Sequence, residues 1–359
     1  MEMRIIDIIE LVDMRNKNLL SDKPMGINID KYFMPSVANT IGVDLKTYKL
    51  VPHNCFACNL MHVGRDERVP MAINKKEDPV LVSPAYLVFR VKESVDVLPD
   101  FLMLWFRRPT FDRNAWFFTA GDVRGGLDKK DFFNMEVHVP DIATQRRIVA
   151  EYQAVEKRIA LNKKTIEALD EMGKTIYKKM FVDDISSDNL PDGWHMGNVG
   201  ELFELQRGFD LPQQDRVNGS FPIFASTGIA SRHNDFKVKA PGIITGRSGS
   251  IGEVFYSFED FWPLNTTLWV KDFKDSSLFF TYFVLRNLDL QSLACGASAV
   301  PTLNRNDVYL LHHIVPDVKT RKEFDIKVSV LYKKIDILKK ENAVNERLLQ
   351  LLLSKIAAE

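Results

Sequence analysis

The chain has 359 residues, of which 45% are hydrophobic, so it is long enough for about two domains with apolar cores. Its 48 Lys and Arg balance its 48 Asp and Glu, so the overall charge points to no nucleic-acid partner and any basic surface has to be local. Three cysteines exclude a disulfide framework, and no apolar run reaches the roughly 20 residues of a bilayer span, so we expect a cytoplasmic protein with no membrane partner.

Two parts of the chain repeat one another at an offset of 176 residues. Leu127 precedes the tripeptide Val139-Pro140-Asp141 at the same spacing at which Leu303 precedes Val315-Pro316-Asp317. Two further pairs match between these points, namely Asp131 with Asp307 and Phe133 with Tyr309. The sequence therefore predicts two copies of one structural plan.

Each copy ends in a segment whose apolar residues alternate three and four positions apart, which is typical of a helix that pairs with another helix. A helix over 148–180 would be about 50 Å long, too long for a small domain to cover, so its natural partner is the helix over 324–356. The expected contact positions are Ile148, Tyr152, Val155, Ile159, Asn162, Ile166, Leu169, Gly173, Ile176 and Met180, and at the same offset Phe324, Val328, Leu331, Ile335, Leu338, Asn342, Asn345, Leu349, Leu352 and Ile356.

The segment 183–192 is dense in turn formers, which predicts a linker. We therefore expect an α+β protein in which two globular α/β domains are separated by two long antiparallel coiled-coil helices, with a pseudo-twofold internal repeat. Helices of this length would hold the two globular domains apart by a distance equal to one to two turns of duplex DNA. The expected boundaries are 1–141 for the first domain, 142–182 for the first helix, 183–192 for the linker, 193–317 for the second domain and 318–359 for the second helix.

Both domains carry recognisable motifs. Those of the first are 10–16 (ELVDMRN), 26–31 (GINIDK), 38–44 (ANTIGVD), 59–66 (NLMHVGRD), 82–86 (VSPAY) and 111–113 (FDR), and those of the second are 190–194 (LPDGW), 246–252 (GRSGSIG) and 302–307 (TLNRND). Together with the order of domains and helices, they resemble the target-recognition domains of specificity subunits of type I restriction-modification systems, over nearly the whole chain. The first domain lacks the Pro-x-Gly-Trp opening and the Gly-Arg-rich loop of the second, so we expect the two to read different DNA sequences.

The resemblance implies that each domain reads one half of a split target on double-stranded DNA and that the helices set the spacer between the halves. It also implies that the chain docks two adenine-N6 methyltransferase subunits, and that endonuclease-translocase subunits join through the resulting core. The chain itself would have no catalytic centre, cofactor or metal.

Base edges are read mainly by Arg, Asn and Gln side chains, and phosphates are held by Lys, Arg, hydroxyls and backbone amides. Glycines in the loop 246–250 would let the backbone approach a phosphate, although a simple turn with an exposed Arg explains the same residues. The candidate DNA contacts are Arg15, Asn16, Lys17, His62, Arg65, Arg68, Arg124, Lys129 and Lys130 in the first domain, and Gln206, Arg207, Ser226, Thr227, His233, Asn234, Arg247, Ser248, Ser250, Ser298, Thr302, Asn304 and Arg305 in the second.

A string of His53, Cys55, Cys58 and His62 contains the usual zinc ligands. Apolar residues interleave with them in what we interpret as a buried strand, where neighbouring side chains point to opposite faces and cannot converge on one ion. We therefore favour small core residues over a metal site.

Two other classes of protein are alternatives to a DNA-reading subunit. A methyltransferase or nuclease would need a glycine-rich cofactor loop, an Asn/Asp-Pro-Pro-Tyr motif or a cluster of acidic residues, none of which is evident in the sequence. A coiled-coil scaffold that binds only protein would tolerate exchange of a globular domain without a change in DNA preference.

Overall fold

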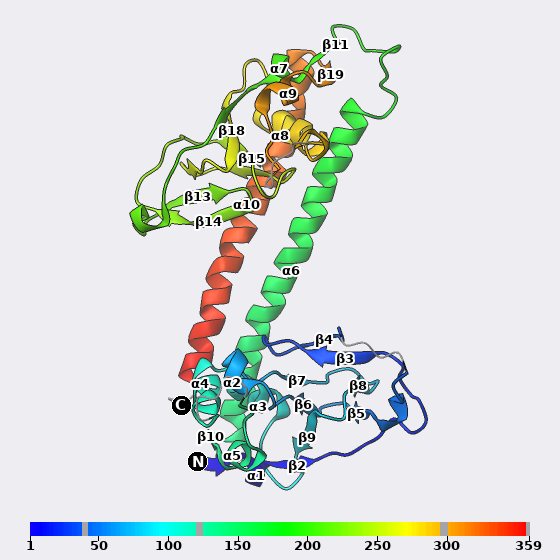
Figure 1. The fold of residues 1–359 in the computed structure, drawn as a ribbon, viewed down its shortest axis with the longest axis vertical. Helices are drawn as coiled ribbons and strands as arrows, with labels where there is room; N and C mark the ends of the chain where they lie inside the picture. The colour runs from blue at the N-terminus through cyan, green and yellow to red at the C-terminus, as the bar shows by residue number, and fades with distance from the viewer. Residues whose placement is uncertain (38–41, 120–124, 295–300, 357–359) are drawn as a thin grey trace. The chain divides into compact units, whose positions relative to one another are not determined.

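The computed structural model describes residues 1–37, 42–119, 125–294 and 301–356. They form two compact units, which we call unit 1 and unit 2. Unit 1 combines Met1–Leu161 with the C-terminal segment that begins at Glu341, and unit 2 covers Asn162–Lys340. The two long helices α6 (Ile142–Phe181) and α10 (Val318–Lys355) each contribute residues to both units (Figure 1).

The described part of unit 1 contains two four-stranded sheets and one two-stranded sheet. The first sheet has the order β2-β9-β6-β7 and is antiparallel throughout. The second has the order β4-β3-β8-β5, in which β3 and β8 are parallel, and β1 pairs with β10. The strands are β1 (Glu2–Arg4), β2 (Ile9–Leu11), β3 (Pro24–Ile27), β4 (Phe33–Pro35), β5 (Lys49–Val51), β6 (Phe56–Cys58), β7 (Met71–Ile73), β8 (Val80–Val82), β9 (Leu87–Val91) and β10 (Glu136–His138).

Aromatic residues from the first sheet and the helices form the main core of unit 1. Phe56 and Phe89 stack at 5.0 Å between ring centroids, and Phe106 meets Phe56 edge-on at 6.0 Å. Phe132 lies 6.0 Å from Phe89 and completes the cluster. The helices are α1 (Ile5–Ile8), α2 (Val63–Asp66), α3 (Pro99–Phe106), α4 (Pro109–Phe117) and α5 (Lys129–Asn134), and a 3-10 turn covers Leu45–Thr47.

Unit 2 repeats this plan. Its first sheet has the order β12-β18-β15-β16, which matches β2-β9-β6-β7 strand for strand, and a two-stranded pair β11-β19 corresponds to β1-β10. A further sheet, β14-β13-β17, also contains one parallel pair. The strands are β11 (His195–Asn198), β12 (Glu204–Arg207), β13 (Phe221–Ala225), β14 (Gly228–His233), β15 (Gly242–Gly246), β16 (Val254–Ser257), β17 (Trp262–Pro263), β18 (Thr267–Asp272) and β19 (His312–Val315).

The core of unit 2 lies around α8, whose residues Phe279, Phe280 and Phe283 are buried. Ser186 and Asn189 form an isolated bridge in the segment after α6, where the sequence predicts a linker. The helices other than α6 and α10 are α7 (Val199–Leu202), α8 (Leu278–Asn287) and α9 (Arg305–Tyr309), and 3-10 turns cover Gln213–Asp215 and Ser292–Ala294.

Helices α6 and α10 lie side by side and antiparallel within each unit. In unit 1, Ile148 and Tyr152 near the start of α6 share a hydrophobic core with Leu353 near the end of α10. In unit 2, the ring centroid of Tyr177, near the end of α6, lies 5.8 Å from that of Phe324, near the start of α10. These contacts confirm the prediction of two long antiparallel helices in a mixed α/β fold.

The buried face of α6 is displaced by one residue near its C-terminal end. The sequence predicts Ile176 and Met180 at the helix contact; both are partly buried against the core, but the fully buried residues there are Tyr177 and Phe181. The reason is that α6 packs against α8 as well as α10, and Tyr177 stacks on Phe283 at 5.2 Å. A helix that covers two neighbours needs a wider apolar face than helix pairing alone provides.

Gly173, which interrupts the apolar spacing of α6, lies at a close approach between helices. A Cβ atom at this position would lie 3.0 Å from the Tyr332 ring and 3.2 Å from the Phe283 ring. A larger side chain would force the rings or the helices to move, so glycine allows α6 to lie against both neighbours.

Candidate nucleic-acid interface

In unit 2, the loop after β15 is held by its two neighbouring loops. The backbone amides of Arg247 and Ser248 both donate to the carbonyl of Thr266, at 2.8 and 3.1 Å. On the other side, the amide of Leu303 donates to the carbonyl of Arg247 at 2.8 Å, and Ser248 forms an isolated bridge with Thr302. The loops before β18 and before α9 therefore fix the position of the Gly-Arg-rich loop.

Glycine is required for the shape of this loop. A Cβ atom on Gly246 would lie 1.9 Å from the carbonyl oxygen of Ser250, and Gly249 has a φ of +85°. No other residue fits the first position, and the second lies in the left-handed region that disfavours side chains. The chain therefore turns sharply after β15, and Ser250 is exposed, while Arg247 is half-buried and its Nη1 lies 3.5 Å from the Asn265 carbonyl.

Further candidate residues border the same loop. Arg207 on β12 faces Leu268 on β18, next to the point at which Gly246 faces Thr267. Ser226, in the turn between β13 and β14, lies against Gly249, and Arg305 donates to the Leu205 carbonyl at 3.2 Å. The candidates gathered here are Gln206, Arg207, Ser226, Thr227, Arg247, Ser248, Ser250, Thr302, Asn304 and Arg305. Asn304 also caps α9, because its side chain accepts from the amide of Asn306.

His233 and Asn234 do not belong to this cluster. They lie at the far end of β14 from the Ser226–Thr227 turn, about 20 Å away along an extended strand. His233 is buried, with its Nδ1 atom 3.1 Å from the Val217 amide and its ring edge-on to Trp262. The structure gives this histidine a packing role.

In unit 1, four candidates come together around α2. The amide of Gly64 donates to the Gly125 carbonyl at 2.9 Å, and the amide of Leu127 donates to the Leu60 carbonyl at 2.8 Å. These bonds join the segment that carries His62 and Arg65 to the segment that leads into α5. Lys129 and Lys130 begin α5 and, like His62 and Arg65, are exposed.

The other candidates of unit 1 are separate. Asn16 is fully buried, and its side-chain amide donates to the carbonyls of Ser21 and Leu45, so it holds two loops together. Arg15 pairs with Asp13 at 2.8 Å, and Arg68 pairs with Asp30 at 2.9 Å. Lys17 is exposed. Two candidates, Arg124 and Ser298, lie outside the described residues.

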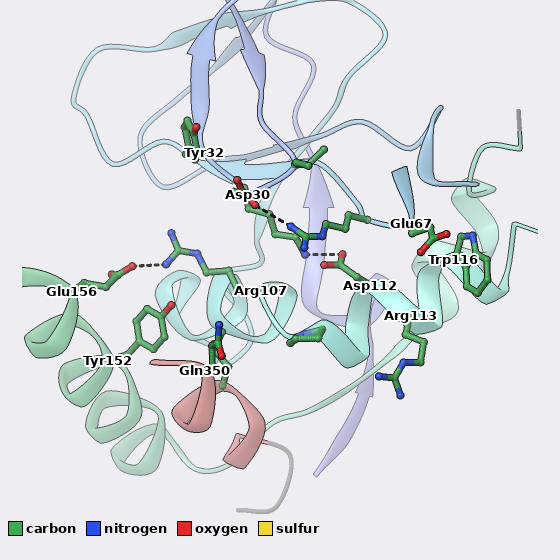
Figure 2. Close-up of a pocket in the computed structure, with 15 residues that line it drawn as sticks. Asp30, Tyr32, Glu67, Arg107, Asp112, Arg113, Trp116, Tyr152, Glu156 and Gln350 are labelled. Carbon is green, nitrogen blue, oxygen red and sulfur yellow. Dashed lines mark hydrogen bonds and ion pairs between the residues drawn. The ribbon is translucent and has the colours of Figure 1, made fainter. Parts of the chain in front are cut away.

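A pocket of about 760 Å³ lies in unit 1 where the β3–β4 connection and α4 meet α6 and α10 (Figure 2). Arg107, just after α3, donates to Glu156 of α6 at 2.8 Å. Lys31 and Asp112 form a buried ion pair at 2.7 Å, in which burial lowers the pKa of Lys31 and the carboxylate opposes that shift. Both cations are paired within the chain: Arg107 attaches the domain to α6, and Lys31 attaches the β3–β4 connection to α4. This pairing has no signal in the sequence, because the partners are far apart along the chain.

The described residues contain no group of three or more His, Cys, Asp or Glu side chains placed to hold a metal ion. Cys55 packs with Ala57 in a small cluster, whereas Cys58 packs with Phe56 in the main core, so the two thiols occupy opposite faces of the strand. Burial raises the pKa of both thiols, which disfavours the thiolate form that binds metals. Among the described helices, none combines the length and apolar character that crossing a bilayer requires.

Comparisons with known proteins bear on this fold. Residues 191–347 match the family described as the type I restriction modification DNA specificity domain. No curated protein matches the chain in sequence. The crystal structure of the S subunit of a type I restriction-modification system from M. genitalium superposes with a TM-score of 0.68 at 15% identity, covering 99% of this chain and 95% of that one.

A second solved structure, which concerns complex assembly and conformational transition of the type I R-M system, has a TM-score of 0.50 at 14% identity. It covers 99% of this chain and 97% of that one. The family match places a DNA specificity domain in the second half of the chain, and the shared fold extends over both halves. The chain therefore has the fold of that S subunit, and over residues 191–347 it is similar to type I restriction modification DNA specificity domains.

Proposed function

We propose that this chain reads a divided target on double-stranded DNA, with one half-site for each globular domain. The proposed domains are 1–141 and 193–317, with helices over 142–182 and 318–359 and a linker over 183–192. The observation that carries the proposal is that the two domains share one strand order but differ in the loops that end those strands. Loops of different sequence offer different donors and acceptors to base edges, so each domain selects its own half-site.

In this proposal, helices α6 and α10 set the length of the DNA between the half-sites. A helix of 40 residues is about 60 Å long, and one turn of duplex DNA is about 34 Å, so the spacer would be one to two turns. The chain would act in the cytoplasm, where its DNA target lies.

Mapping of methylated adenines across the genome, in cells with and without this chain, tests the proposal. The expected result is a bipartite motif that disappears when the chain is absent. Exchange of the domain 193–317 for that of another specificity subunit should change one half of the motif and leave the other half and the spacer intact. A motif that survives deletion of the chain would refute the function. An exchange that alters assembly but not DNA preference would point to a scaffold.

We also propose that two methyltransferase subunits dock on the helices, and that endonuclease-translocase subunits join through them. The proposal is supported by a second apolar face on α10, separate from the face that contacts α6. Val330 and Val344 on this face are 66% and 65% exposed. The residues of the face are Ile326, Val330 and Ile337 in unit 2, and Val344, Leu348 and Leu351 in unit 1.

The internal repeat gives α6 an equivalent face. The positions 176 residues earlier are Ala150, Ala154, Leu161, Ala168, Met172 and Thr175, all exposed and all but the last apolar. A row of exposed apolar residues along a helix is typical of an interaction site, and a face that occurs twice fits two copies of one partner. The similar structure that concerns complex assembly of the type I R-M system is consistent with such partners.

The double substitution Val330→Glu and Ile337→Glu tests this docking face. Both side chains are exposed, so the chain should fold normally but lose binding of one methyltransferase subunit, as measured by the mass of the complex in solution. Lys327→Glu is the matched control, because Lys327 is exposed and, one position after Ile326, lies about 100° around α10 from it. Full assembly of the double variant would refute the proposed face.

A further inference from the structure

Arg108, between α3 and α4, is a buried cation for which the described residues supply no carboxylate partner. Only 8% of the residue is exposed, and its guanidinium lies over the Trp105 ring at 4.1 Å. Within the ranges that the structure describes, its Nε atom has no hydrogen-bond acceptor and no carboxylate forms an ion pair with it. Burial lowers its pKa, with no opposing charge. Buried charges are normally paired, so an external acceptor is expected here.

Arg108 borders a pocket of about 370 Å³ on one side of α4. Thr110 lies in the first turn of α4, where the positive end of the helix dipole favours an anion. Asn114 and Asn134 add amide donors, and Glu136 is the carboxylate at the border. The remaining lining residues are the apolar Trp105, Phe111, Phe118 and Met135. The site combines one buried cation with an aromatic wall.

This chemistry favours a protein carboxylate over a DNA phosphate. Phosphates are usually bound by several exposed cations, whereas this pocket has one arginine, largely covered, and an acidic residue at its border. Aromatic residues beside a buried arginine are typical of the centre of a protein interface. Phe118 on this border is 48% exposed, as expected for a surface that a partner covers.

The position of the pocket on α4 agrees with this choice. Trp116 faces α2, since its Nε1 atom donates to the Gly64 carbonyl at 3.3 Å, and α2 carries the candidate DNA contact Arg65. Asn114 and Phe118 are each two positions from Trp116, which places them on the opposite side of the helix. The pocket therefore lies on the side of α4 that faces away from α2 and its Arg65.

We propose that this pocket receives an Asp or Glu side chain, flanked by apolar residues, from a methyltransferase subunit. The carboxylate would accept hydrogen bonds from the guanidinium of Arg108, and the flanking residues would cover Phe118. This inference rests on the proposed assembly with methyltransferase subunits and adds a contact on the first globular domain.

The test compares Arg108→Met with Arg113→Met in the full-length chain. Arg113 lies one turn along α4, is exposed, and lines the other pocket (Figure 2), so its substitution removes the same charge from the other side of the helix. The probe is the methyltransferase subunit of the same system, and its dissociation constant is measured by calorimetry. Loss of one partner of a buried charge pair weakens binding about 30-fold or more, which we expect for Arg108→Met and not for Arg113→Met.

Thermal unfolding of the isolated chain separates binding from a structural role. Since the unpaired cation disfavours the folded state, Arg108→Met should unfold at the same temperature as the wild type or higher. A lower unfolding temperature together with weaker assembly would overturn the proposal in favour of a packing role. Unchanged binding of the methyltransferase subunit by Arg108→Met would also overturn the proposal. If that variant instead binds DNA more weakly, the pocket receives a DNA phosphate. A wild-type chain that binds no methyltransferase subunit would refute the proposed assembly itself, and this contact with it.

Discussion

Arg107 in unit 1 and Arg286 in unit 2 occupy equivalent places, but they attach their domains to the long helices in different ways. Arg107 directly follows α3, the helix after β9, and Arg286 lies near the end of α8, the helix after β18. Strands β9 and β18 hold the same place in the two matching sheets. Arg107 makes one ion pair, with Glu156 of α6, and its guanidinium lies 5.9 Å from the Tyr152 ring. The polar contacts of Arg107 therefore reach only one of the two long helices, α6.

The attachment in unit 2 is a network that includes both long helices. Arg286 makes two hydrogen bonds to Asp170 of α6, at 2.8 and 3.3 Å, and one to the Tyr332 hydroxyl of α10 at 3.3 Å. The Tyr332 hydroxyl in turn donates to Asp170 at 2.7 Å, and Lys174 adds an ion pair at 3.2 Å. Three elements are held at one carboxylate.

The two copies have kept the arginine at this place but not the residue that accepts its hydrogen bonds. Tyr332 lies 176 residues after Glu156, so the position that supplies the carboxylate in unit 1 supplies a hydroxyl in unit 2. Asp170, on the other long helix, has taken over the charge. The arginine and its contact with the helices are retained, while the identity of the acceptor is not. We therefore expect the two attachments to differ in strength.

The largest effect is expected for Arg286→Met. This change leaves the half-buried carboxylate of Asp170 without its main cation, and the free energy of unfolding of unit 2 should fall by about 3 kcal/mol. Urea unfolding of the full-length chain measures the change. Lys174→Met is the control, because it removes only the exposed partner of the same carboxylate and should cost about 0.5 kcal/mol. Equal losses for the two variants would show that the network does not depend on Arg286.

The second-largest effect is expected in the stability of unit 2, which should depend on pH because Asp170 must be ionised to keep its hydrogen bonds. Burial disfavours ionisation of this carboxyl, but the hydrogen bonds from Arg286 and Tyr332 outweigh it and lower the pKa of Asp170 to about 2. A lowered pKa in the folded state contributes stability above the ordinary value near 4, and that stability is lost as the pH falls towards 2. The unfolding free energy of the wild type relative to Asp170→Asn should therefore shrink by about 2 kcal/mol between pH 5 and pH 2. A constant difference between the two chains would contradict the assigned pKa.

The features that sequence alone predicted are those with a period or a repeat. The alternating spacing predicted paired helices, and Ile148 and Phe324 are buried as expected. The offset of 176 residues predicted two copies of one plan, which the matching strand orders of the two sheets bear out. The alternation around Cys55 and Cys58 placed the two thiols on opposite faces. In each case a regular backbone fixes where side chains point.

The features that sequence did not predict depend on contacts between distant segments. Asn16 and His233 have the polar character of DNA contacts, but tertiary packing uses their polar atoms inside the chain. Arg107 and Arg108 are neighbours in the sequence and look equivalent there. Only the fold shows that Arg107 pairs with Glu156, whereas the Nε atom of Arg108 has no acceptor among the described residues. Composition cannot distinguish these outcomes, because burial is a property of the whole domain.

The smallest effect is expected for Arg107→Met, and it completes the comparison of the two attachments. The ion pair with Glu156 joins side chains that are 29% and 41% exposed, so solvent screens it and its loss should lower the unfolding free energy of unit 1 by less than about 1 kcal/mol. Met is similar in length but uncharged, so the change removes the ion pair together with the cation-π contact to the Tyr152 ring. Urea unfolding under the conditions used for Arg286→Met makes the two values comparable. If the loss equals that for Arg286→Met, the strength of each attachment resides in the retained arginine, and the additional partners in unit 2 contribute no stability of their own.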